Sequence, residues 1–272
     1  MFSKINHVAI VSDNYAVLAK FYEAVFGMKP SAKTKPVRAV NVGDGDVGLN
    51  INPRRAGRVA GLDHFGIQVE NVETVFERMR NKKYAGANWV QRPSSRPFAG
   101  VTGNDPDGNV FDISQKDMTN RGGVYVENTG QVNERHVDHV ALRTMRPAEM
   151  AEFYKEVFEL APANVSKGKD DPNQYLTDGH MTLVLMPWNI TDYLGTGIVR
   201  SGMDHIGFKV DDIAAFRQDV DKIADDNPHL APEPLGKSPE GKALEELCRR
   251  SYPFGDHWMA DSDGILLNVR AN

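Results

Sequence analysis

Short runs of alternating apolar and polar residues, each followed by a helical pattern, recur along the chain. INHVAIV at 5–11 and VDHVALR at 137–143 are rich in β-branched residues and alternate, which is typical of a strand. KFYEAVFGM at 20–28 and EFYKEVFEL at 152–160 place apolar residues three and four positions apart, which predicts amphipathic helices. Both pairs are offset by the same 132 positions. A strand, a helix and the spacing between them have therefore been duplicated together.

A second pair of segments follows the same logic. LDHFGIQVENV at 62–72 resembles MDHIGFKVDDI at 203–213, and each runs into a predicted helix. Each of these units ends in an Asp-Gly turn and a strand, at DPDGNVFDIS (105–114) and DSDGILLNVR (261–270). The last unit carries about 15 extra residues around 229–247, a Pro-rich and charged stretch that we interpret as an excursion over the surface.

These patterns predict an α+β fold of four βαβββ modules. The polar, Gly-containing stretch 117–135 is interpreted as a linker between an N-terminal half (1–116) and a C-terminal half (136–272). The modules are expected at 4–53, 61–116, 136–187 and 202–271.

A strand with a central His, a helix with F-Y-x-x-V-F and a closing D-P-D-G-x-x-x-acid strand together resemble the vicinal oxygen chelate superfamily. That superfamily includes glyoxalase I, methylmalonyl-CoA epimerase, extradiol ring-cleaving dioxygenases and the fosfomycin- and bleomycin-resistance proteins. The resemblance implies that paired modules close into half-barrel domains and that metal ligands come from the first and last strand of each module. It is specific for the fold and not for the reaction, because this fold carries several chemistries.

Carried over position by position, the resemblance gives the N-terminal half four candidate metal ligands: His7, His64, Asp112 and Asn50. Two imidazoles and one carboxylate suit a divalent ion such as iron, manganese, zinc, nickel or magnesium, with positions left open for substrate. Asn50 would add a weak neutral oxygen ligand.

The C-terminal half offers a weaker set of ligands. The corresponding residues are His139, His205, Val184 and Asn268, so no carboxylate remains. We therefore expect the C-terminal metal site to be the less favoured of the two.

Three basic residues of the C-terminal half share strand faces with this weaker set. Alternation places Arg143 on the face of His139, Lys209 on that of His205 and Arg270 on that of Asn268. They could form a basic cavity for a carboxylate or phosphate, although solvated strand ends are the more ordinary interpretation.

The reaction is left open by the sequence. Four modules in one chain are the layout of extradiol dioxygenases, which hold their metal in the C-terminal half through two His and a Glu. Here Asn268 takes the Glu position and Trp258 the position of a catalytic Tyr. These departures favour Lewis-acid lyase or isomerase chemistry on a small, vicinally oxygenated molecule. A ring-cleaving Fe(II) dioxygenase and a non-catalytic ligand-binding protein remain the alternatives, and no catalytic residue is assigned.

Composition narrows the cellular setting. The 272 residues are 40% hydrophobic and 25% charged, with a formal net charge of -5, which gives no support for a nucleic-acid or anionic-membrane surface. The first residues lack the pattern of a secretory signal. The single cysteine, Cys248, excludes an intrachain disulfide and favours a reducing, cytoplasmic location. The expected partners are a small-molecule substrate, which could carry a carboxylate, and further copies of the chain.

Overall fold

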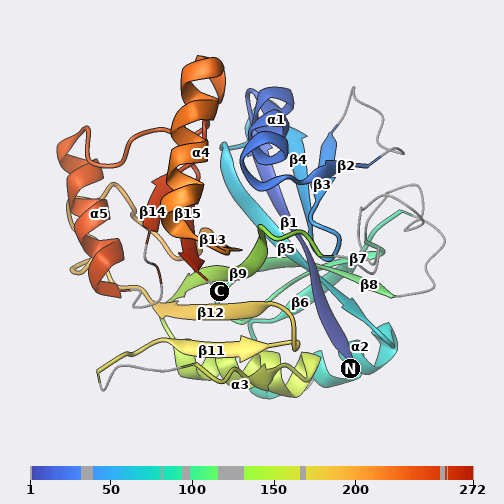
Figure 1. The fold of residues 1–272 in the computed structure, drawn as a ribbon. Helices are drawn as coiled ribbons and strands as arrows, with labels where there is room; N and C mark the ends of the chain where they lie inside the picture. Colours follow the sequence, from blue (N-terminus) through green and yellow to red (C-terminus); the bar gives the residue numbers. More distant parts are fainter. Residues whose placement is uncertain are drawn as a thin grey trace.

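Two mixed β-sheets form the framework of the molecule (Figure 1). The structure is a computed structural model, and it describes residues 2–31, 39–80, 82–93, 99–115, 132–165, 170–251, 255 and 257–271.

The first sheet has eight strands in the order β2-β3-β4-β1-β5-β8-β7-β6. Its strands are β1 (Ser3–Ser12), β2 (Lys29–Pro30), β3 (Val40–Gly43), β4 (Gly48–Pro53), β5 (Gly61–Val69), β6 (Asn88–Gln91), β7 (Val101–Asn104) and β8 (Val110–Gln115). β1 and β5 pair antiparallel at its middle, and each pairs in parallel with the last strand of its own module, β4 or β8.

The second sheet repeats this order as β10-β11-β12-β9-β13-β15-β14 and, within the described residues, lacks only a counterpart of β6. Its strands are β9 (His136–Thr144), β10 (Ala161–Pro162), β11 (Gln174–Thr177), β12 (Thr182–Pro187), β13 (Gly202–Val210), β14 (His257–Ala260) and β15 (Leu266–Ala271). The predicted α+β fold of repeated βαβββ modules is confirmed.

Each module contributes one helix after its first strand. The helices are α1 (Tyr15–Phe26), α2 (Val72–Met79), α3 (Pro147–Phe158), α4 (Ile213–Asp226) and α5 (Pro239–Ser251), with short 3₁₀ turns at Lys82–Tyr84 and Pro228–Leu230. α5 is the additional element, and most of it lies in the extra segment that the sequence predicted around 229–247. No helix in the described part of the chain has the length and apolar character needed to cross a membrane.

α1 and α3 form for the same reason and end at corresponding residues. Both bury the apolar stripe predicted from the F-Y-x-x-V-F pattern. α1 ends at Gly27, in the left-handed backbone region at φ 66°. The equivalent residue after α3 is Glu159 at φ 56°, a conformation that costs a side-chain-bearing residue about 1 kcal/mol. Glu159 also forms an ion pair with Arg78 of α2 at 2.6 Å.

Helices from opposite halves pack in pairs. α1 lies against α4 and α2 against α3, as the two helix groups of Figure 1 show. Phe26 of α1 stacks on Phe208 of β13 with ring centroids 3.8 Å apart, and Phe158 of α3 meets Phe111 of β8 at 5.2 Å. One hydrophobic cluster therefore includes residues from both sheets, and the two halves share a core.

Four aspartates at equivalent turns tie the halves together reciprocally. Each lies just before the last strand of its module. Asp44 accepts the backbone N–H of Val137 (2.8 Å), and Asp178 accepts that of Ile5 (2.6 Å). In the other two modules an aspartate accepts a buried tyrosine hydroxyl from the opposite half: Tyr154 donates to Asp105 at 3.0 Å and Tyr22 to Asp261 at 2.7 Å. The sequence identified Asp105 and Asp261 as turn residues but made no prediction for Asp44 or Asp178, and it gave no sign of any of the four partners.

The proposed division into halves at 116 and 136 stays a prediction. Most of the linker expected at 117–135 lies outside the described residues, which resume at Val132.

Asp261 should make folding stability depend on pH. Burial raises the pKa of Asp261 to about 6 from 3.8, although hydrogen bonds from Tyr22, Ile265 and Asp263 oppose this shift. Because the folded pKa lies above the unfolded one, this stabilisation is complete below about pH 4 and is lost as pH rises through 6. The loss should reach up to about 3 kcal/mol.

The Asp261→Asn variant removes this titration while keeping a side chain that can accept the same backbone hydrogen bonds. Urea unfolding between pH 4 and 7 should therefore show a wild-type stability that falls relative to D261N. The exposed control Asp226→Asn should follow the wild type. Parallel curves for D261N and wild type would contradict the assignment.

Candidate metal centre

An extra residue precedes the histidine on each central strand of the first sheet. The pairing of β1 with β5 passes from Ile5 directly to His7 and from His64 directly to Leu62, so Asn6 and Asp63 are β-bulge residues. Neighbouring side chains of a regular strand point to opposite faces, whereas a bulge residue can share the face of its neighbour. The side chains of Asn6 and Asp63 therefore reach the rings that follow them.

These bulge residues form hydrogen bonds with the Nδ1 atoms of the two histidine rings. Asn6 Oδ1 lies 2.8 Å from His7 Nδ1, and Asp63 Oδ2 lies 2.8 Å from His64 Nδ1. Asp63 is held in turn by an ion pair with Arg58. An acceptor at Nδ1 places the proton on that nitrogen, which leaves the Nε2 lone pair for a metal. This is the orientation that metal-bound imidazoles require.

A glycine makes room for the ring of His7. Gly66 pairs with His7 across the β1–β5 ladder, and a Cβ built on Gly66 would lie 1.9 Å from the ring. No larger residue fits at position 66 while His7 keeps this position.

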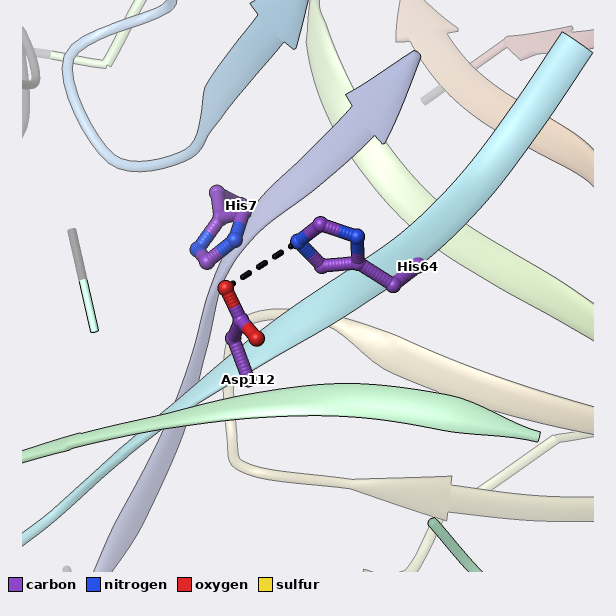
Figure 2. Close-up of side chains that lie close together, drawn as sticks. All are labelled: His7, His64 and Asp112. Carbon is purple, nitrogen blue, oxygen red and sulfur yellow. Dashed lines mark ion pairs between the residues drawn. The ribbon is translucent and has the colours of Figure 1, made fainter. Parts of the chain in front are cut away.

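Asp112 completes a group of three on the same face. β8 pairs in parallel with β5 so that Asp112 lies beside Gly66. Its Oδ2 is 3.2 Å from His64 Nε2, and the candidate ligand atoms of His7, His64 and Asp112 all lie within 4.8 Å of one another. Figure 2 shows the three side chains pointing toward one another from β1, β5 and β8. All three are buried.

The triad attracts positive charge. Burial alone would raise the pKa of Asp112, but its hydrogen bond with His64 and the charges of His64, His7 and Arg92 outweigh burial and hold this pKa well below its usual range. Burial alone would lower the pKa of His64, but Asp112 and Asp63 together raise it to about 9. A proton thus occupies a place that a divalent ion could take, and the donor set of two oriented imidazoles and one ionised carboxylate fits such an ion.

Residues 4–113 match the sequence model of the Glyoxalase/Bleomycin resistance protein/Dioxygenase superfamily. This part of the chain belongs to that superfamily. A comparison with curated protein sequences gave no match.

The whole chain shares the superfamily fold with solved structures. The Mn(II)-bound glyoxalase from Novosphingobium aromaticivorans is 14% identical, with a TM-score of 0.62 over 99% of this chain and 82% of the other. The 2,3-dioxygenase LapB from Pseudomonas sp. KL28 is 15% identical, with a TM-score of 0.63 over 99% and 92%. A mutant of 4-hydroxymandelate synthase from Streptomyces coelicolor is 16% identical, with a TM-score of 0.60 over 100% and 93%. At these identities the likeness establishes the fold and leaves the reaction open.

Asn50, the fourth predicted ligand, lies on the same face of the sheet as the triad. On β4 it pairs with Ala9, which in turn pairs with His64. Its Oδ1 is buried and has no hydrogen-bond partner among the described residues. A role for Asn50 as a ligand stays a prediction.

In the second sheet the two histidines bond to each other. His139 and His205 follow bulge residues, Asp138 and Asp204, which hold their Nδ1 atoms. The two Nε2 atoms are 3.1 Å apart, so one donates to the other and at least one ring is neutral. Burial, together with the charge of His205, lowers the pKa of His139 to about 4.

Within the part of the chain that the structure describes, no carboxylate completes this second histidine pair. Asn268 lies on β15 at the position that Asp112 holds on β8, and it is fully buried. Gly255 packs so closely on Asn268 that a Cβ there would lie 1.5 Å from its Nδ2. Among the described residues, His7, His64 and Asp112 form the one group of three close metal-ligand side chains.

The three predicted anion-binding cations already have carboxylate partners. Arg143 pairs with Asp204 at 2.6 Å, while Arg270 and Lys209 lie 2.7 and 3.8 Å from Asp138. A bound anion would have to compete with these two buried carboxylates. The basic pocket therefore stays a prediction, and the ion pairs weaken it.

Sequence reasoning missed the residues that surround the ligands. The dipeptide Asn-His or Asp-His recurs at 6–7, 63–64, 138–139 and 204–205. This repeat could have identified the residues that hold the histidine rings. Thr102, which donates to Asp112 Oδ1 at 2.7 Å, and Arg92, 2.6 Å from Oδ2, gave no comparable signal.

Gly66→Ala should impair metal binding, because its methyl group would displace the His7 ring. We expect metal affinity to fall at least about tenfold, since loss of ligand orientation by a neighbouring residue costs 10–100-fold. Gly207→Ala is a matched control, because a Cβ there would lie 1.8 Å from the His139 ring in the other sheet. Calorimetric titration with Mn²⁺ should separate the two variants. Equal losses in both would show that the effect is general destabilisation.

Proposed function

We propose that the chain is a metal-dependent enzyme acting on a small, vicinally oxygenated molecule, with His7, His64 and Asp112 holding the ion. The observation that carries this proposal is the geometry of the triad. Asn6 and Asp63 hold Nδ1 of both imidazoles, and the candidate ligand atoms of the three side chains lie within 4.8 Å of one another. Outer partners of this kind are typical of functional metal sites.

A divalent ion bound here would supply Lewis-acid polarisation of two neighbouring substrate oxygens. The protein's part is to keep the ligands fixed. Thr102 holds Oδ1 of Asp112, which directs Oδ2 toward His64. Asp63 makes His64 a stronger metal ligand by accepting a hydrogen bond from its Nδ1 proton. Arg58 pairs with Asp63, so the charge of this carboxylate is balanced.

We favour lyase or isomerase chemistry for this site. The positions that would carry a catalytic tyrosine and the third ligand in the C-terminal half hold Trp258 and Asn268, and the histidine pair there is closed upon itself. A metal ion held by the N-terminal triad would need no redox change to act as a Lewis acid.

A ring-cleaving Fe(II) dioxygenase is the second candidate. Two histidines and one carboxylate are also the ligands of non-haem iron oxygenases. Several structures that share this fold are described as 2,3-dioxygenases, among them LapB and a homoprotocatechuate enzyme.

Asp112→Ala should abolish tight metal binding, because only neutral ligands would remain. We expect a loss of more than about 100-fold, the upper limit for an outer-sphere partner. Asn268→Ala is the matched control and should leave the metal content unchanged. Elemental analysis of protein purified without chelator, followed by Mn²⁺ titration, measures both. Unchanged binding by D112A would show that the metal lies elsewhere.

The reaction class is tested by turnover of catechols, 2-oxoacyl compounds and thiol adducts, with oxygen uptake recorded. Lewis-acid activity should persist without oxygen and with zinc or magnesium in place of iron. Oxygen consumption matched to product, lost on iron removal and not restored by zinc, would establish the dioxygenase instead. Ligand retention without turnover of any compound would favour a binding protein.

A further inference from the structure

Among the described residues, Arg92 is the arginine whose side chain contacts the triad. It follows the last residue of β6, and its Nη1 lies 2.6 Å from Asp112 Oδ2. The same oxygen faces His64 Nε2 at 3.2 Å, while Oδ1 accepts the hydroxyl of Thr102. The oxygen available to an ion between the two histidines is therefore the oxygen that Arg92 engages.

The exposed fractions of these side chains indicate which of the three residues is able to move. The Asp112 side chain is 2% exposed and the His64 side chain 10%, whereas that of Arg92 is 23% exposed. The backbone of Arg92 is fixed by its N–H bond to Gly100 O. A long side chain on a fixed backbone at the solvent edge can change partners without disturbing the sheet.

Electrostatics indicates when Arg92 would leave Asp112. A divalent ion on the triad would exceed the single negative charge of Asp112, so Arg92 would then face a site that no longer attracts it. The nearby Arg58 has no such freedom, because its carboxylate partner Asp63 also holds His64. Arg92 would be left as a guanidinium fork beside an electropositive site, an arrangement that suits a carboxylate.

We propose that Arg92 is an exchangeable counter-ion that neutralises Asp112 in the metal-free protein and binds the carboxylate of the substrate once the metal is in place. This inference rests on the proposed metal site and narrows the substrate class to small acids that carry a second oxygen next to the carboxylate, such as 2-oxo and 2-hydroxy acids. Arg92 is then the specificity-determining residue for the anionic group. The sequence had suggested anion binding for Arg143, Lys209 and Arg270 of the other half.

The first measurement is Mn²⁺ affinity, determined from the electron paramagnetic resonance signal of the free ion. Arg92→Gln removes both the competitor for Oδ2 and a nearby positive charge, so it should bind Mn²⁺ about tenfold more tightly, the scale of one charge-assisted hydrogen bond. Arg54→Gln is the control, because Arg54 forms an exposed ion pair with Asp13 and contacts no member of the triad. It should leave Mn²⁺ affinity unchanged.

The second measurement is the affinity of the Mn²⁺-loaded proteins for oxalate, determined from water-proton relaxation. Oxalate carries two neighbouring carboxylates, so one can lie on the metal while the other meets Arg92. R92Q should bind oxalate at least about tenfold more weakly than wild type, while Arg92→Lys, which keeps the charge and loses the fork, should lie between them. Thermal unfolding of each variant verifies that the fold is kept.

The outcomes separate the two proposals. A wild-type protein that binds no Mn²⁺ would overturn the metal site, and this inference with it. A wild-type protein that binds Mn²⁺, with R92Q unchanged toward both Mn²⁺ and oxalate, would overturn the role of Arg92 alone. Weaker Mn²⁺ binding by R92Q would show that Arg92 supports Asp112 as a ligand and does not compete with the ion.

Discussion

The β-bulge before each histidine is the constraint on which the site depends, because it lets two consecutive side chains share one face of the sheet. In a regular strand, the side chains of Asn6 and Asp63 would lie on the opposite face from His7 and His64, and the two rings would have no local partner to set their orientation. The bulge instead places an oxygen at each Nδ1 and frees Nε2 for the centre of the sheet. Asp112 needs only ordinary parallel pairing with β5 to join them.

The rest of the fold holds these strands in place from the other side. The core faces of the two sheets pack against helix pairs drawn from both halves, so neither sheet can shift alone. Reciprocal hydrogen bonds reinforce this packing: Asp178 holds the backbone of Ile5, two residues before His7, and Asp44 holds that of Val137, two residues before His139. Each half thus fixes the first strand of the other, and the position of the candidate ligands depends on the intact pair.

The two halves share one fold and differ in the electrostatics of their histidine centres. Both keep two bulged histidines and a glycine beneath one ring, yet one centre has Asp112 and the other Asn268. The carboxylate attracts a proton, a guanidinium or a metal ion, and the pKa of His64 rises to about 9. The amide carries no charge and the histidines bond to each other, while burial lowers the pKa of His139 to about 4. The exchange of one carboxylate oxygen for an amide NH2 group therefore separates a centre with a negative charge from one whose histidines bond to each other.

The sequence by itself determined the module pattern, because strand and helix periodicity are local and a repeated offset needs no tertiary information. It also placed the four histidines on strands and distinguished Asp112 from Asn268. The bulges left a trace in the sequence too: apolar residues stand three apart across each Asx-His pair, as in Ile5 and Val8. Tertiary structure alone decided the partners. That Arg92 meets Asp112, that Asp138 and Asp204 neutralise the C-terminal cations, and that each turn aspartate binds the opposite half all depend on how distant strands come together, and no local pattern encodes such distances.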